Sequence, residues 1–182
     1  MIGPYVAACV LLAVAGAAKV ARPGDTARAL VATVGLRREV ARPIVRLVAG
    51  TEAVMGIAGI ARPSPLTAGL VAGSYLGFAL FVSMVLSRGG PLATCGCFGA
   101  SDTPPTRLHV AVDVVLAASA LAVVVTVPTE WLPHLLSAQP WLGLPLVLAS
   151  LLFAALILLA LTRLAQLGDI RRRLGIVRGG TR

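Results

Sequence analysis

The chain has 182 residues, of which 58% are hydrophobic and 13% are charged, and its mean hydropathy is +0.92. This composition excludes an ordinary soluble domain, and apolar stretches of about 18 residues or more predict membrane-spanning helices. The net charge of +9 would suggest a nucleic-acid partner in a soluble protein. In a membrane protein that charge belongs to the loops, so no nucleic acid is expected. Three cysteines are too few for a disulfide framework.

Five apolar stretches predict an all-α membrane protein with five spans. We divide the chain into a four-helix bundle, an outer loop with a fifth span, and a basic cytoplasmic tail. The tail carries three successive arginines among apolar residues, which is typical of a helix resting on an anionic leaflet. The predicted spans are 2–21, 44–61, 66–87, 108–127 and 141–162, and the three parts are 1–127, 128–162 and 163–182.

The first span and its connector come first in the chain. The span lacks a basic segment before it, so we interpret it as a retained helix and not as a cleaved signal peptide. Lys19 lies at its end, where a long side chain can reach the interface. Pro23 and Gly24 then interrupt the helix. Between them and Gly35, apolar residues repeat with the period of one helix face. This predicts a short amphipathic helix on the membrane surface.

Polar residues recur inside three of the apolar stretches. Glu52 lies near the middle of the second span, roughly 12 Å in at 1.5 Å per residue, where a carboxylate needs a partner or a water-filled cavity. His109 and Asp113 are four residues apart and share one face of the fourth span. We expect Lys19 or Arg46 to pair with Glu52 or Asp113. The predicted polar cluster comprises Lys19, Arg46, Glu52, Arg107, His109 and Asp113. It is either a structural set of ion pairs or a functional polar pocket.

The third span carries three glycines spaced by four residues, Gly69, Gly73 and Gly77. They form two overlapping G-x-x-x-G motifs, which allow another helix backbone to come close. We favour packing inside the same bundle over a seam in a homo-oligomer or hetero-oligomer, and both remain open.

The run Cys95-Gly96-Cys97-Phe98-Gly99 is the one place where two reactive side chains lie close together. A disulfide across one residue would be strained and easily reduced, which suits a switch better than a structural bridge. A cation such as Arg107, or His109, would lower the pKa of either thiol if it lay nearby. The two cysteines with His109 form an incomplete soft-metal set, so no metal is assigned. The alternative without a chemical role is that the two cysteines are simply small residues in a turn.

The distribution of basic residues predicts the orientation of the chain. Of the 16 Lys and Arg residues, 15 fall on one side of the five predicted spans and only Arg62 falls on the other. The excess of positive charge marks the cytoplasmic side. The N-terminus is therefore expected outside a cell (inner or plasma) membrane, and the C-terminus and the cysteine motif are expected in the cytoplasm.

Two parts of the chain resemble known families. The first helix ending in Lys19, the Arg22-Pro23 break and Glu52 in an apolar helix resemble DoxX-like membrane proteins. The run 87–90 followed by the Cys-Gly-Cys-Phe-Gly motif resembles the MauE branch, the methylamine-utilisation membrane proteins, over roughly residues 5–127. The resemblance implies a four-helix membrane bundle that takes part in thiol–disulfide handling during maturation of an extracytoplasmic dehydrogenase. It does not imply methylamine as substrate.

The expected function follows from the motif and this resemblance. It is that of a possible thiol–disulfide oxidoreductase component, with Cys95 and Cys97 as catalytic residues, a thioredoxin-like partner and a quinone as a candidate acceptor. A non-catalytic membrane scaffold is the alternative, and a soft-metal site is a weaker one. The fifth span and the tail depart from the four-helix pattern, and the expected cytoplasmic motif is opposite to the extracytoplasmic role that the resemblance implies.

Overall fold

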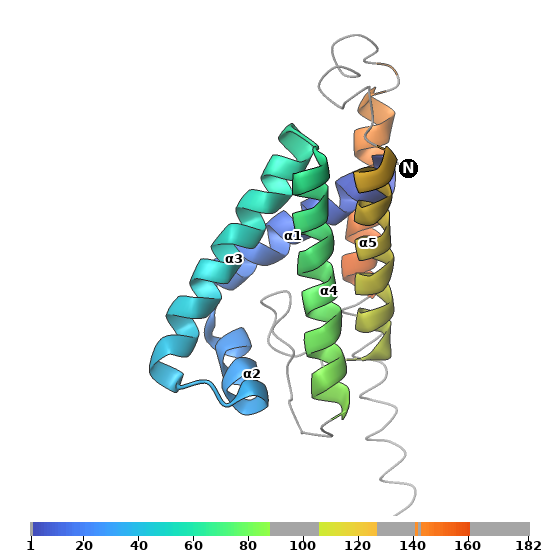
Figure 1. Ribbon diagram of the computed structural model, residues 1–182. Coiled ribbons are helices and arrows are strands. Elements are labelled where there is room, and N and C mark those ends of the chain that lie inside the picture. Colours follow the sequence, from blue (N-terminus) through green and yellow to red (C-terminus); the bar gives the residue numbers. More distant parts are fainter. Residues whose placement is uncertain (1, 88–105, 127–140, 142, 161–182) are drawn as a thin grey trace, which may run out of the picture.

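The computed structural model describes residues 2–87, 106–126, 141 and 143–160, and all secondary structure in these residues is helical (Figure 1). Among these described residues, five helices are long and apolar enough to span a membrane, as the composition predicted. The cysteine motif and the basic tail lie outside the described residues. The labelled helices are α1 (Ile2–Ala21), α2 (Gly24–Val34), α3 (Arg38–Ala61), α4 (Pro65–Ser87) and α5 (Arg107–Thr126), and Gly143–Ala160 forms the last span.

Helix α1 is the centre of the packing. It lies against α3 along its length and also contacts α5, while α4 and α5 pack against each other as an antiparallel pair (Figure 1). The largest fully buried side chains of the core include Tyr5, Leu11 and Leu12 of α1, together with Val71 and Val82 of α4. The lipid-facing side of every span is rich in exposed apolar residues, as expected for helices whose outer surface meets acyl chains.

Glycines allow α1 and α3 to come into backbone contact. A Cβ atom on Gly16 of α1 would lie 2.6 Å from the carbonyl oxygen of Ala49, and one on Gly56 of α3 would lie 2.5 Å from that of Cys9. Neither position can carry a side chain without moving a helix. Close approach of this kind replaces the hydrophobic effect as the source of helix association in lipid.

The glycine face of α4 does not pack inside the described bundle, contrary to our expectation. Gly73 and Gly77 are exposed, and no described atom lies within 4 Å of a Cβ built on them or on Gly69. The buried stripe of α4 runs instead through residues such as Ala72 and Tyr75, which are displaced around the helix from the glycines. Small side chains permit close approach, but they do not determine which face has a neighbour.

The connector between α1 and α3 forms the predicted amphipathic helix α2. Gly35 ends it in the left-handed conformation, with φ 74°, and its N–H bonds to the carbonyl of Val31, as in a common helix stop. The second span was predicted to start at residue 44, but α3 already begins at Arg38 and continues through Pro43. Proline removes one hydrogen bond, to the carbonyl of Glu39. Because Glu39 is exposed, water can satisfy that carbonyl and the helix continues.

The close contact of α1 and α3 predicts that adding a methyl group has a large effect on stability at one glycine and a small effect at another. Gly56→Ala should destabilise the protein by about 1–3 kcal/mol, because the new Cβ overlaps the backbone of α1. Gly73→Ala adds the same atom to an open helix face and should change stability by less than about 0.5 kcal/mol. Thermal melting of both variants in the same detergent measures the difference. Equal melting temperatures would contradict the packing of α1 on α3.

Candidate functional site

A buried ion pair joins α1 and α3. Lys19 Nζ lies 2.6 Å from Glu52 Oε2, and the side chains are only 5% and 7% exposed. Lys19 therefore points into the bundle and not to the interface, where its place at the helix end had suggested it would go. The Gly16 contact explains the distance: Gly16 is one turn before Lys19, and it meets the backbone of Ala49 and Ala53, which flank Glu52.

Phe78 of α4 completes the surroundings of the lysine. The ammonium group lies 4.2 Å from the centre of the Phe78 ring, a distance at which a cation is attracted to the aromatic face. The ring in turn makes an edge-to-face contact with Tyr75 at 5.9 Å. The Tyr75 hydroxyl donates a hydrogen bond to the carbonyl of Ala8 at 2.7 Å. Three helices thus fix the position of the charge.

An apolar cavity of about 290 Å³ opens beside the ion pair. Lys19, Glu52 and Thr26 supply its polar side chains, and apolar side chains of α2, α3 and α4 form the rest. Its apolar lining includes Leu30, Ile44, Val45, Val48, Phe78 and Phe81. A mostly apolar cavity with a few convergent polar groups is the usual form of a small-molecule site.

His109 and Asp113 of α5 share a cavity wall with Phe78. They line a second, much smaller cavity of about 20 Å³ together with residues of α1 and α4, including Phe78 itself. That volume is large enough for one water molecule. His109 is buried, and its Nδ1 is 2.8 Å from the Thr106 hydroxyl, just before α5. His109 and Asp113 were predicted to share one face of their helix, and both line the same cavity.

Two members of the predicted cluster lie outside this buried site. Arg46 of α3 and Arg107 of α5 are both exposed. The partner of Glu52 is Lys19 and not Arg46, because Arg46 is six residues from Glu52 and projects from a different face of α3. Cys95 and Cys97 are outside the described residues. The segment that contains them joins the last turn of α4 to the first turn of α5, and both turns lie at the end of the bundle where α2 lies (Figure 1).

Sequence reasoning missed the aromatic part of the site. Phe78 and Tyr75 stand among apolar residues of the third span, and nothing in that pattern sets them apart from lipid-facing residues. The glycines at the contact of α1 and α3 were also missed. A signal for Gly56 existed, because Ala49, Glu52 and Gly56 follow a spacing of three and four residues, which puts them on one helix face.

Comparison with known families decides the classification. Residues 2–128 match the family described as "Methylamine utilisation protein MauE". The chain belongs to the MauE family. Comparisons with curated proteins and with solved structures found no match. All the residues of the buried site lie within the range that the family covers, whereas the Gly143–Ala160 helix of this MauE protein lies beyond it.

The buried site of the MauE protein can hold charge at membrane depth. An isolated Lys or Glu there would be very unfavourable, but the ion pair, the aromatic ring and the close helix contact compensate each other. Glu52 accepts a hydrogen bond from Lys19 through one carboxylate oxygen. Lys19 keeps further N–H groups that can donate to a ligand carbonyl. The arrangement suits recognition of a polar group attached to an apolar body.

Removal of one partner of the ion pair should destabilise the protein strongly. Glu52→Leu leaves Lys19 without its carboxylate inside the bundle, with an expected loss of about 3 kcal/mol or more. Glu52→Gln keeps a hydrogen-bond acceptor and should have a smaller effect. The double variant Lys19→Met/Glu52→Leu should recover most of the loss, since an apolar pair of similar size is tolerated. Thermal melting in detergent measures all three.

Glu39 on the same helix provides the control. It pairs with Arg37 at 3.6 Å, but both side chains are 81% exposed, so Glu39→Leu should leave the melting temperature nearly unchanged. If Glu52→Leu melts like the parent, the carboxylate does not stabilise a buried cation.

Proposed function

We propose that this MauE-family protein transfers reducing equivalents between a thioredoxin-like protein and an acceptor in the membrane, through Cys95 and Cys97. The observation that supports the proposal is the buried Lys19–Glu52 pair on the wall of an apolar cavity. The closest contact between α1 and α3 elsewhere relies on glycine, at Gly16 and Gly56, and needs no charge. A costly charge pair beside a cavity points to a ligand.

The proposed reaction balances as a thiol–disulfide exchange followed by oxidation of the thiol pair. A thiolate of the partner's dithiol attacks the Cys95–Cys97 disulfide, the partner's second thiol resolves the mixed disulfide, and the partner leaves as a disulfide while Cys95 and Cys97 become thiols. The two cysteines are then returned to the disulfide by loss of two electrons and two protons to the acceptor.

A quinone is the acceptor class that the apolar cavity fits. When bound, a quinone supplies a two-electron, two-proton acceptor. The chain's own part would be to bind and orient the quinone: Leu30, Ile44 and Phe81 would contact its apolar body, and Lys19 would donate a hydrogen bond to a carbonyl oxygen. Glu52 holds the lysine in place. The nearby His109–Asp113 cavity provides two groups that can carry protons.

A membrane scaffold is a second candidate, and the exposed glycine face of α4 favours it. Gly73 and Gly77 offer a helix surface that another helix can approach closely. In this function the protein holds a partner enzyme in the membrane, and the two cysteines only shape the segment between α4 and α5.

We further propose that the protein lies in the cell membrane with its N-terminus outside and its C-terminus inside. The support is the charge count, with 15 of 16 basic residues on one side. A reporter fused after Arg182 should be active only in the cytoplasm, and Cys95 and Cys97 in intact cells should resist an impermeant thiol reagent. Rapid labelling from outside would reverse the orientation and place the motif in the extracytoplasmic space.

The cysteine pair provides the test of the redox function. Cys95→Ser and Cys97→Ser should each abolish thiol–disulfide exchange and leave the melting temperature unchanged. Each single-cysteine variant should trap a mixed disulfide with a thioredoxin-like partner. Because the two sulfurs are one residue apart, the couple should be more oxidising than structural disulfides, which lie below about −300 mV. Redox titration in nanodiscs measures the potential.

Cys9 is the matched control, since it is the buried cysteine of α1. Cys9→Ala should leave the redox titration unchanged. If both motif thiols stay reduced over the accessible range, and the double serine variant still supports the partner's activity, the scaffold function replaces the redox one.

A further inference from the structure

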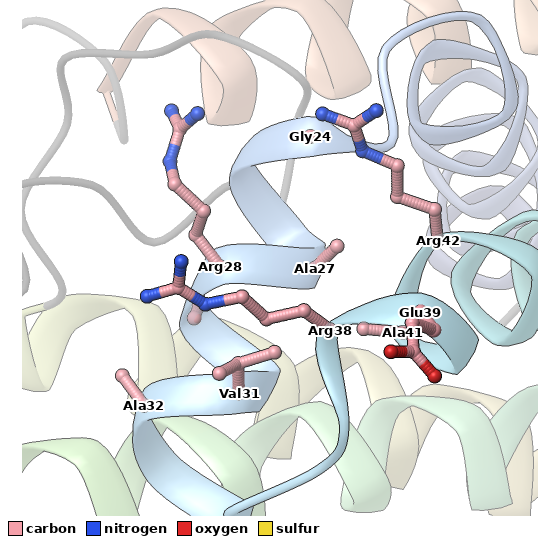
Figure 2. Close-up of a pocket in the computed structure, with 10 residues that line it drawn as sticks. Gly24, Ala27, Arg28, Val31, Ala32, Arg38, Glu39, Ala41 and Arg42 are labelled. Atoms are coloured by element: carbon pink, nitrogen blue, oxygen red, sulfur yellow. The ribbon is translucent and has the colours of Figure 1, made fainter.

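A third and larger pocket lies apart from the two cavities described above, at the corner where α2 meets the start of α3. Its volume is about 900 Å³. Small side chains, among them Ala27, Ala32 and Ala41, form part of its wall and leave the space open (Figure 2). No residue of the Lys19–Glu52 site lines it, so it calls for an explanation of its own.

Three arginines line this pocket from two helices. Arg38 and Arg42 come from the first turns of α3 and extend toward α2, and Arg28 comes from α2 (Figure 2). The planar guanidinium group binds two oxygens of a phosphate or carboxylate at once. Arginines from two helices that line one pocket therefore favour an anionic ligand with several oxygens.

Nearby carboxylates leave two of these arginines available. Asp25 pairs with Arg28 within α2. Glu39, the carboxylate that lines the pocket, pairs with Arg37, which does not line it. Within the part of the chain that the structure describes, Arg38 and Arg42 take part in no ion pair. The pocket thus has its strongest unbalanced positive charge on the α3 side.

The depth of the pocket matches the headgroup layer of a membrane. Arg38 and Arg42 stand in the first turns of α3, which is long and apolar enough to span a membrane. Arg46 continues the line of Arg38 and Arg42 at intervals of four residues, so all three lie along one face of α3. A lipid with its phosphate at Arg38 and Arg42 would have its acyl chains at the level of the membrane-spanning turns of α3.

We propose that this corner binds the phosphodiester of an anionic phospholipid, with Arg38 and Arg42 as its main ligands, Arg28 as a third contact and Arg46 beside the lipid backbone. The chemistry is that of phosphate recognition by paired guanidinium groups. The position of these arginines at the end of a membrane-spanning helix is the reason to assign the phosphate to a lipid and not to a soluble compound. This assignment does not depend on the redox function.

The test is a titration of the detergent-purified protein with phosphatidylglycerol and, separately, with phosphatidylcholine of the same chain length. Native mass spectrometry counts bound lipid. Phosphatidylglycerol should bind more tightly, and the double variant Arg38→Gln/Arg42→Gln should weaken its binding about 25-fold, at about fivefold for each arginine. Binding should also weaken as salt is raised. The same weakening should be absent for phosphatidylcholine.

The control variant is Arg62→Gln/Arg107→Gln, which removes two exposed arginines that do not line the pocket, one at the far end of α3 and one at the start of α5. It should bind phosphatidylglycerol like the parent, and circular dichroism should show that both double variants are folded. Equal binding by the Arg38/Arg42 variant, or equal weakening by the control, overturns the site. Glycerol 1-phosphate is the soluble arm: if it displaces the lipid at similar concentration, the lipid assignment fails and the pocket is a site for a soluble phosphate.

Discussion

The contact of Lys19 with Glu52 is the constraint on which the rest of the bundle depends. Two charges 33 residues apart meet at 2.6 Å inside an apolar protein, and each would be very unfavourable there alone. They can meet only because Gly16 and Gly56 let the backbones of α1 and α3 touch. The glycine contact therefore fixes the ion pair, and the ion pair selects this register of α1 on α3 over others.

Charge in this protein is arranged by depth. The exposed arginines of α2 and α3 lie at the membrane boundary, where water and headgroups screen them, and the paired lysine and glutamate lie inside. Helix α2 turns the chain between these two levels, and Gly35 ends α2 so that the line of arginines starts with Arg38 at the first residue of α3. The arginines at the helix ends and the buried pair are thus two parts of one arrangement.

Helix positions followed from the sequence because they depend on local composition. Apolar runs bounded by arginine, proline or glycine predicted α1 with its observed bounds and α4 to within one residue. The choice of partner for Glu52 was not predictable from depth alone, because Lys19 and Arg46 both lay within reach. Helix face decides it: Ala49, Glu52 and Gly56 share the buried stripe of α3, and Arg46 is outside that stripe. The exposed glycines of α4 could not be placed because a motif for close approach carries no information about which neighbour is present.

Phe78 connects the two halves of the candidate site. Its ring contacts the lysine ammonium group and forms a wall of both the apolar cavity and the small His109–Asp113 cavity. A displacement of the ring would therefore change the shape of both cavities at once. None of the described residues of the Gly143–Ala160 helix lines either cavity; Ser150 lies beside Gly3 near the opposite end of α1. The last helix therefore supports the central helix from its far end, and the candidate site is built wholly from the part of the chain that the MauE family covers.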